Sequence, residues 1–449
     1  MARRSWTLER RDMLRHLGLG LGLVGSSCAT WVPALAAKLA DDPRRRRHCI
    51  LLWMSGGPSQ TDTFDMKAGH ANGGAFKEVA TSVPGLRFSE HFSQLGKHAD
   101  RLAVIRSLST KEGDHARGTH LVRTGHPPMA NVAYPSICCS LAKELESASN
   151  PLPNYVSVAP QQAISPAAFG PGFLGAKYAP AVVAAAAGQP MPAATSDNAA
   201  TPLADLRLEN IVAPSGVTAV QQSRRLDLWN ALEQKFLAGH SAPAFAAHRG
   251  TYEKAVEMMR PEVLAAFDLT DESDEVRRRY GPGLFGQGCL LARRLVERGV
   301  PFVEVGLGEG LAWDTHQDNF RRVQRLSEEL DAGWATLMTE LHERGLLDST
   351  TILWMGEFGR TPAINGAGGR DHFPNAWSCV LAGGGIQGGQ AYGRTSADGT
   401  QVEENMVGIG DVLATLCAAA GVPPDSENIT PADRPIKLTE GTPIRAILA

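Results

Sequence analysis

The sequence predicts an α/β protein with a largely parallel central sheet that helices cover on both faces. Short apolar runs alternate along the chain with longer amphipathic segments, which is the pattern of strands that alternate with helices. The apolar runs contain few polar residues, as in strands that are buried on both faces. With 43% hydrophobic and 20% charged residues, the 449-residue chain also has the composition of a folded globular protein.

The expected strands are the apolar runs. CILLWM is followed by SGGP and TTILWM by a glycine, so both runs are predicted to end in loops. The remaining runs are similarly short, as strands usually are. We predict strands at 49–54, 101–107, 154–158, 301–305, 350–355 and 378–382.

The expected helices are longer and have apolar residues at helical spacing. Pro135 stands near the start of the first, where a missing N–H group costs nothing, and glycines close the others. We predict helices at 134–148, 285–299, 319–344 and 411–420.

Residues 159–280 interrupt this alternation. Residues 159–218 are rich in alanine, proline and glycine, which predicts a loop-rich excursion, and residues 219–280 are charged and helical in pattern. The chain is therefore predicted to form a single domain at 37–449, with a loop-rich and helical insertion at about 159–280.

Residues 1–36 are predicted to be an export signal peptide. Arg10 and Arg11 precede a run without charge at 17–37, which contains Ala34-Leu35-Ala36 as a small-x-small cleavage site. The paired arginines resemble a twin-arginine signal, and an N-terminal anchor helix is the alternative. The signal predicts transfer by the export machinery to the periplasm, the cell envelope or the medium, with no stable membrane span in the mature chain. A net charge of −3 argues against a nucleic-acid partner.

Polar clusters follow four of the predicted strands. In open α/β sheets, ligands bind at the carboxyl ends of the strands. Carboxylates and imidazoles are ligands of divalent metals such as zinc and manganese, and arginines bind anionic groups. The candidates are Asp62 and Asp65 after the first strand, Asp114, His115 and Arg117 after the second, Asp314 and His316 after the fourth, and Glu357, Arg360, Asp371 and His372 after the fifth.

Each cluster alone also fits a structural role. Carboxylates in these loops are common in turns and helix caps, and Glu357 with Arg360 fits a structural ion pair. Asp314 and His316 alone fit a turn. Residue types that bind metals follow several strands of one predicted sheet, and this favours a single shared site.

Five longer motifs resemble, over nearly the whole chain, the family called domain of unknown function 1501. That family is similar to a branch of the alkaline phosphatase and sulfatase superfamily. The resemblance implies an α/β/α sandwich with a metal centre at the strand ends and a nucleophile at a helix N-terminus, where backbone N–H groups help to bind an anion. The motifs are GGPSQTDTFD at 56–65, CLLARRLVERGVPFVEV at 289–305, WDTHQDNF at 313–320, GLLDSTTILWMGEFGRTP at 345–362 and GRDHFPNAWSCVLAGGGIQGGQAYG at 369–393.

The resemblance implies metal ligands at the later strand ends. An aspartate and a histidine of the superfamily match Asp314 and His316, although here they are closer together. A following Asp-His pair falls at Glu357, which keeps the carboxylate without the imidazole. The last histidine of the superfamily matches His372, next to Asp371.

The first strand departs from the superfamily pattern. Ser55-Gly56-Gly57 stands where the superfamily has a metal-binding aspartate, so Asp62 or Asp65 would have to replace it. The resemblance implies one or two divalent ions, and the sequence does not distinguish zinc, manganese, magnesium and calcium.

The implied nucleophile is also different. Asp114 and His115 stand where the superfamily has a serine, a threonine or a modified cysteine. His115 is therefore expected to act as nucleophile, base or metal ligand. Arg117 or Arg360 is expected to neutralise the oxyanion of the transferred group.

Two function classes follow. The first is an exported metal-dependent hydrolase of phosphate or sulfate esters, whose partner is an anionic ester substrate. The alternative is a non-catalytic exported protein of similar fold that binds envelope glycans or partner proteins. The strand-end residues favour the first class, and the missing aspartate and hydroxyl nucleophile favour the second.

Overall fold

The computed structural model describes residues 47–147, 150–185, 201–208, 211, 216–240 and 243–449. The signal peptide predicted at 1–36 lies outside these residues, so it stays a prediction. In the part of the chain that is described, no helix is both long and apolar enough to cross a bilayer.

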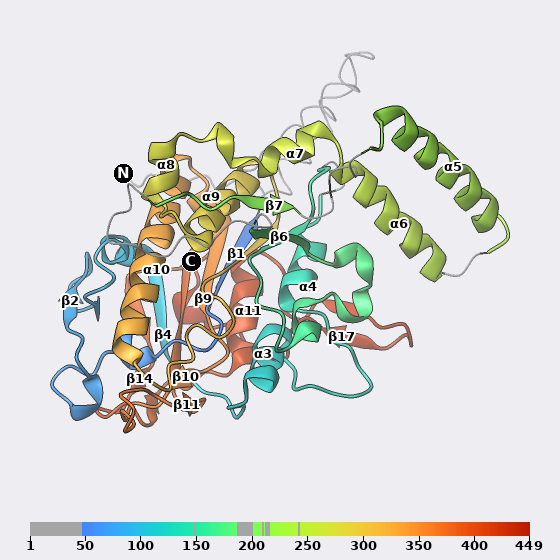
Figure 1. Ribbon diagram of the computed structural model, residues 1–449. Helices are drawn as coiled ribbons and strands as arrows, with labels where there is room; N and C mark the ends of the chain where they lie inside the picture. The colour runs from blue at the N-terminus through green and yellow to red at the C-terminus, as the bar shows by residue number, and fades with distance from the viewer. Residues whose placement is uncertain (1–46, 148–149, 186–200, 209–210, 212–215, 241–242) are drawn as a thin grey trace, which may run out of the picture.

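A nine-stranded sheet forms the centre of the protein (Figure 1). All six strands predicted from apolar runs belong to it. Seven strands run in one direction, and β12 and β7 run in the other. The spatial order is β13 (Gln390–Tyr392), β4 (Leu102–Leu108), β12 (Trp377–Gly383), β9 (Thr350–Met355), β1 (His48–Trp53), β8 (Phe302–Gly306), β5 (Tyr155–Val158), β6 (Ala181–Ala185) and β7 (Leu206–Leu208).

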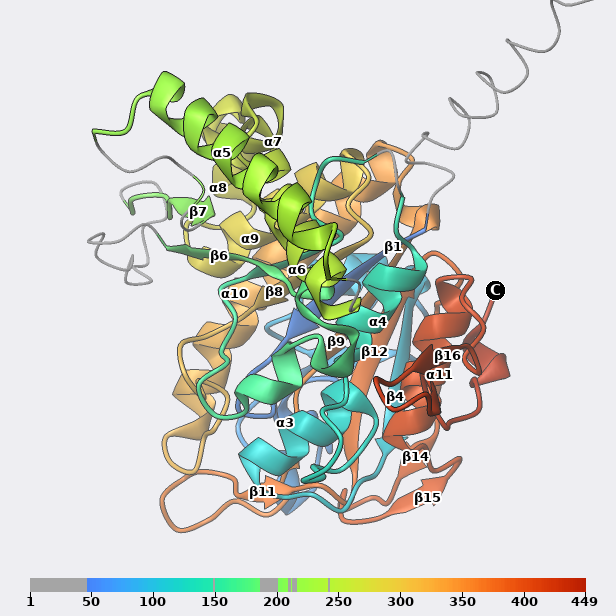
Figure 2. The ribbon, with the colours of Figure 1, turned by 90° about the vertical axis from the view of Figure 1, so that its right-hand side faces the viewer.

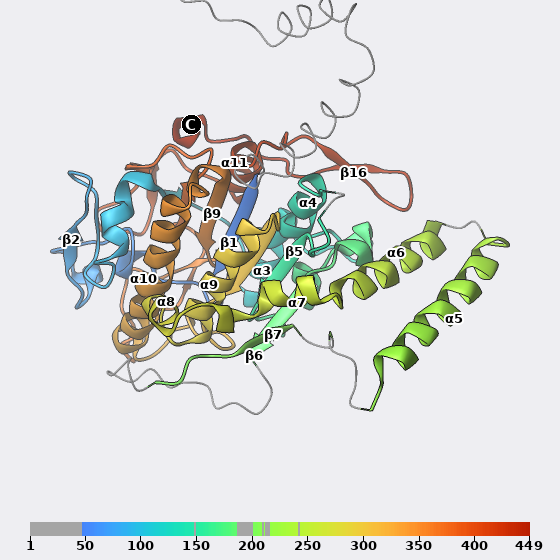
Figure 3. The ribbon, with the colours of Figure 1, turned by 90° about the horizontal axis from the view of Figure 1, so that it is seen from above.

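Helices cover both faces of the sheet, as the sequence predicts (Figures 1 and 3). Along β1, Ile50 and Leu52 face one hydrophobic core, and Leu51 and Trp53 face the other. The first core contains residues of α9 (Leu284–Glu297) and α10 (Asn319–Glu343), and the second contains residues of α3 (His115–Thr124), α4 (Ile137–Glu144) and α11 (Ile409–Ala419). The predicted α/β class with a mostly parallel sheet is confirmed.

Arg123 of α3 forms a buried ion pair with the sheet. Its guanidinium is buried and donates to both carboxylate oxygens of Glu304 on β8, at 3.0 and 2.7 Å. Its Nε donates to the carbonyl oxygen of Ala168 at 3.1 Å, and its Cζ lies 5.0 Å from the ring centroid of Trp53. The helix that begins at His115 is therefore held in a defined position on the strand that precedes Asp314.

The region predicted as an insertion extends the sheet and adds helices. β6 lies in a segment where the composition predicts a loop. There the adjacent valines at 182 and 183 continue the parallel pairing with β5. α5 (Ala219–Leu237) and α6 (Pro243–Met258) project from the body in Figures 1 and 3 and lie in front of it in Figure 2. In contrast, α7 (Pro261–Phe267) and α8 (Asp274–Arg279) lie close to α9.

Short two-stranded sheets lie outside the central sheet. One of them, β10 (Gly359–Arg360) with β11 (His372–Phe373), lies at the edge where the parallel strands end. The others pair β2 (Glu78–Ala80) with β3 (Arg87–Ser89), β14 (Arg394–Thr395) with β15 (Val402–Glu404), and β16 (Glu427–Ile429) with β17 (Pro435–Lys437).

The reversed direction of β12 matters for the site. The carboxyl ends of β1, β4, β8 and β9 lie at one edge of the sheet, the lower edge in Figure 1. Because β12 is antiparallel to β4 and β9, its amino end lies at this same edge. The hairpin β10–β11, which precedes β12 in the chain, is thereby placed beside the loops that follow the parallel strands.

Candidate metal centre

Three imidazoles surround the carboxylate of Asp314. The Nε2 atom of His115 lies 3.5 Å from Oδ2 of Asp314. The Nε2 atoms of His316 and His372 lie 3.1 and 3.3 Å from Oδ1, and 3.0 Å from each other. Among the described residues, His115, Asp314 and His372 form a group whose ligand atoms all lie within 4.8 Å of one another.

The Nδ1 atom of each imidazole is held by an oxygen that accepts hydrogen bonds. Nδ1 of His115 donates to Oε1 of Glu357 at 2.6 Å, and Nδ1 of His316 donates to Oδ1 of Asp371 at 2.7 Å. Nδ1 of His372 donates to the carbonyl oxygen of Gly113 at 2.6 Å. Metal-binding histidines in proteins are usually oriented in this way.

This arrangement turns electron-rich atoms toward one another. With Nδ1 protonated, each neutral imidazole presents the lone pair of Nε2 to the carboxylate of Asp314. Lone pairs that face one another are stable only with a cation or a proton between them. The residues present therefore fit a divalent metal ion.

Without a metal, a proton on His115 fills this role. Burial disfavours the charged imidazole, but the hydrogen bonds to Asp314 and Glu357 outweigh it and raise the pKa of His115 to about 9. Burial opposes ionisation of Asp314, yet His115, His372 and Arg360 lower the pKa of this carboxyl well below its usual range. Asp314 is therefore an anion at any working pH.

Arg360 is buried and forms an ion pair with Asp314. Its side chain is 0% exposed, and Nη2 lies 2.6 Å from Oδ1 of Asp314. Nε donates to the carbonyl oxygen of Gly57 at 3.0 Å, and Nη2 also donates to that of Gly56. The guanidinium is thus occupied by protein groups and does not reach solvent.

Glu357 is also fully buried. Its Oε1 accepts hydrogen bonds from His115 and, at 2.8 Å, from the backbone N–H of Gly56. Its Oε2 has no hydrogen-bond partner among the described residues. A buried carboxylate oxygen without a donor is costly, and a nearby cation would reduce that cost.

The remaining predicted residues lie outside this cluster. Asp62 forms a buried ion pair with Arg370, at 2.8 and 2.9 Å, and Asp65 accepts hydrogen bonds from Lys67 and Thr395. The structure therefore does not bring either aspartate to Asp314.

Two predicted residues flank the start of α3. Asp114 caps the helix by accepting a hydrogen bond from the backbone N–H of Arg117 at 3.0 Å. The Arg117 side chain is 53% exposed and pairs with Glu112 at 2.6 Å.

Comparison with known proteins assigns the chain to a family. A family model described as "Protein of unknown function (DUF1501)" matches residues 46–448. The chain belongs to the DUF1501 family. No curated protein matches it.

Several solved structures resemble this DUF1501 protein. Ps i-CgsB is 12% identical, with 89% of this chain and 75% of that chain covered and a TM-score of 0.40. A protein in the alkaline phosphatase superfamily from Vibrio parahaemolyticus is 12% identical, with 84% and 67% covered and a TM-score of 0.38. PsFucS1 sulfatase from Pseudoalteromonas sp. is 14% identical, with 87% and 70% covered and a TM-score of 0.36.

Sequence reasoning missed three supporting groups of the DUF1501 site. The backbone carbonyl of Gly113 holds His372, Nδ2 of Asn365 donates to Asp371 at 3.1 Å, and Nε2 of Gln60 donates to the carbonyl oxygen of Arg360 at 2.7 Å. A contact made by a backbone carbonyl cannot be predicted from residue identity, because every residue has one. The two amides gave no signal either, because asparagine and glutamine are common in loops and Gln60 lies 300 residues from Arg360 in the chain.

Gly56, which follows the first strand, leaves no room for an acidic side chain in this DUF1501 protein. Its φ is +108°, and a Cβ atom there would lie 2.5 Å from the backbone nitrogen of Asp314. An aspartate side chain at residue 56 would therefore collide with the loop that holds Asp314.

We expect Gly56→Ala to destabilise the metal-free protein by about 2 kcal/mol or more, because the substitution adds a backbone clash to an unfavourable φ. Gly69→Ala is the matched control, since Gly69 has φ +82° and a Cβ atom there would have no neighbour within 4 Å. This control is expected to lose about 1 kcal/mol. Urea unfolding measures both, and equal losses would contradict the role of the clash.

Proposed function

We propose that this protein is an exported metal-dependent hydrolase of phosphate or sulfate esters. The observation that supports the proposal most is the convergence of three Nε2 atoms on the Asp314 carboxylate, each with its Nδ1 atom fixed by an oxygen. Such a ligand set with oriented imidazoles is typical of metal centres. Export is proposed from the N-terminal segment alone.

The donor set favours zinc or a similar transition metal over calcium or magnesium. Imidazole nitrogen suits zinc and similar transition metals, whereas calcium and magnesium prefer oxygen ligands. When bound, such an ion would polarise an ester oxygen and lower the pKa of a water molecule. His115, Asp314, His316 and His372 are the residues proposed to hold it.

Charge balance favours one ion over two. At neutral pH, Asp314, Glu357 and Asp371 contribute three formal negative charges, and Arg360 contributes one positive charge. One divalent ion therefore neutralises the cluster, and a second would leave it doubly positive in a partly buried site. Asp62 is neutralised by Arg370 and does not change this balance.

The open side of the cluster is near His316. Its side chain is 46% exposed, whereas that of His115 is 12% exposed. A substrate would therefore approach from the side of His316. Of the two arginines proposed to contact the oxyanion, only Arg117 is accessible, so Arg360 is proposed to position Asp314 instead.

A non-catalytic binding function is the second candidate. It is favoured by the start of α3, where His115 and not a hydroxyl or thiol side chain occupies the first turn. In that case the metal would bind a glycan or a partner protein of the envelope without turnover.

The test uses the chain from residue 37 onward. Bound metal is measured by mass spectrometry, and phosphate monoesters, phosphate diesters and sulfate esters are assayed. We expect about one transition metal per chain and hydrolysis of one ester class. The double variant Asp314→Asn, His316→Ala should lose both. A metal-free wild type, or activity that the double variant retains, would refute the hydrolase; metal without activity would favour the binding function.

A further inference from the structure

The helices α5 and α6 carry an apolar surface that the rest of the protein does not cover. Five of the ten exposed large hydrophobic side chains found among the described residues lie on these two helices, namely Val220, Leu228, Leu232 and Phe236 of α5 and Tyr252 of α6. Figure 1 shows both helices projecting from the body, and Figures 1 and 2 place α5 at the opposite end of the protein from β11. A concentration of exposed apolar side chains marks a surface that contacts another molecule or a membrane.

α5 has more apolar side chains than its contact with α6 explains. Trp229 faces α6 and stacks on Tyr252, with ring centroids 5.3 Å apart. Leu228, Leu232 and Phe236 are spaced by four residues, so they form one apolar row along the helix. Their side chains are 62%, 59% and 41% exposed. A helix that needed only to pack against α6 would have polar residues in this row.

Three cations stand beside the apolar row. Side chains that are three or four residues apart are neighbours on the surface of a helix. The neighbours of Leu228 and Leu232 at this spacing include Arg224, Arg225 and Lys235, and none of these neighbours is a carboxylate. The three cations are exposed, and no ion pair of theirs is found in the part of the chain that the structure describes. They form a basic flank of the apolar row.

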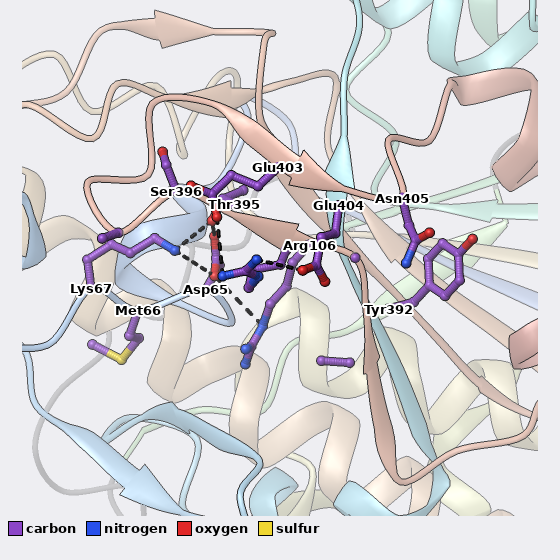
Figure 4. Close-up of a pocket in the computed structure, with 14 residues that line it drawn as sticks. Asp65, Met66, Lys67, Arg106, Tyr392, Thr395, Ser396, Glu403, Glu404 and Asn405 are labelled. Atoms are coloured by element: carbon purple, nitrogen blue, oxygen red, sulfur yellow. Dashed lines mark hydrogen bonds and ion pairs between the residues drawn. The ribbon is translucent and has the colours of Figure 1, made fainter.

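The basic flank differs from the cations around the cavity that is shown in Figure 4. There, Nζ of Lys67 lies 3.0 Å and Nε of Arg106 lies 3.9 Å from Oδ1 of Asp65. Arg394 lines the same cavity and pairs with Glu404. Carboxylates of the protein already neutralise these cations, whereas the positive charge of the basic flank is left for a binding partner.

The surface of an anionic bilayer matches both features of α5. Its headgroups carry negative charge directly above the acyl chains, so a helix face with apolar and basic side chains contacts both regions at once. Lysine and arginine side chains are long enough to reach the headgroups while their neighbours enter the apolar region.

A second copy of the chain fits α5 less well. In an antiparallel pair of α5 helices centred between Leu228 and Leu232, Arg225 of one copy would face Lys235 of the other. Like charges that face one another across an interface are unfavourable. The basic flank therefore disfavours this pairing of α5 with itself.

We propose that α5 binds the surface of a bilayer that contains anionic lipids. The apolar row enters the interface of the bilayer, and the basic flank contacts the headgroups. Because α5 projects from the body, it reaches the bilayer without burying the rest of the protein. Binding does not involve the metal centre, which lies at the opposite end of the protein, so it is independent of the proposed hydrolase.

The test measures co-sedimentation of the protein with lipid vesicles. The chain from residue 37 onward contains every described residue, and it leaves out the uncharged run at 17–37, which would itself enter a bilayer. We expect vesicles of phosphatidylglycerol and phosphatidylcholine in equal parts to bind at least about ten-fold more tightly than vesicles of phosphatidylcholine alone. Equal binding to both kinds of vesicle, or binding to neither, would overturn the proposal.

One pair of variants tests the apolar row. The double variant Leu228→Gln, Leu232→Gln should bind the anionic vesicles at least about ten-fold more weakly, because two apolar side chains no longer enter the interface. Met406→Gln, Ile429→Gln is the matched control, since these side chains are 66% and 57% exposed outside the hairpin, and it should bind as the wild type does. Thermal unfolding shows that each variant is folded. Unchanged binding by the folded α5 variant would overturn the proposal.

A second pair of variants tests the basic flank. Arg224→Gln, Arg225→Gln should lose most of the preference for phosphatidylglycerol. Arg321→Gln, Arg394→Gln removes the same net charge from side chains that are 84% and 60% exposed elsewhere, and it should keep the preference. Equal loss in the two double variants would show that net charge alone directs binding, which contradicts a site on α5.

Sedimentation velocity without lipid tests the second copy. We expect a monomer that stays a monomer in the variant Leu228→Gln, Leu232→Gln. A wild-type dimer that this variant dissociates would overturn the proposal and assign the apolar row to self-association.

Discussion

Arg123→Met is expected to destabilise the protein by about 3–5 kcal/mol, the cost of leaving one partner of a buried ion pair without the other. The substitution leaves the carboxylate of Glu304 buried without its two hydrogen bonds from the guanidinium. It also removes the stacking of the cation on the rings of Trp53 and Phe169. Urea unfolding of metal-free protein measures the loss.

The double variant Arg123→Met, Glu304→Gln is the control. It removes both charges, so the loss should be clearly smaller than that of Arg123→Met alone. If the double variant is as unstable as the single variant, packing around residue 123 matters more than the ion pair. The hydroxyl of Tyr155, which contacts both partners, remains in either case.

The second large effect is a dependence of stability on pH in the metal-free protein. The pKa of His115 is raised from 6.5 to about 9 in the folded state, so the folded protein holds this proton more tightly than the unfolded chain. The resulting stabilisation is complete below pH 6.5 and is lost as the pH rises through about 9. It amounts to about 3 kcal/mol.

This dependence is measured by urea unfolding between pH 6 and pH 10 in the presence of a chelator. His115→Gln should lack the loss, because glutamine does not titrate. The difference between wild type and variant isolates His115 from the other groups that titrate in this range. Parallel curves for the two proteins would contradict the proposed environment of His115.

Much of the fold could be predicted because apolar runs report burial directly. All six runs became strands of the central sheet, and the predicted helices appear with ends that differ from the prediction by at most four residues. The helix predicted at 134–148 is α4, from Ile137 to Glu144, because Ser136 caps it by accepting a hydrogen bond from the backbone of Cys139. β6 was missed because alanine-rich composition hides a strand whose pairing comes from distant β5.

The candidate site was predicted in part for a related reason. Residue type and position after a predicted strand identified Asp314, His316, Glu357 and His372 as candidate ligands. The structure places these four residues together. The same signals are present at Asp62, but its partner Arg370 is 308 residues away in the chain. Whether a carboxylate faces a metal or an arginine depends on such distant partners, which the local sequence does not reveal.

The residues around Asp314 come from loops that are far apart in the chain, and this separation affects how the protein folds. His115 and Glu357 are 242 residues apart, and Gly56 and Glu357 are 301 apart. Closing such long loops is slow and entropically costly, so we expect these contacts to form after the central strands have paired. A metal ion that binds at the proposed site would therefore bind late in folding, after the central sheet has formed.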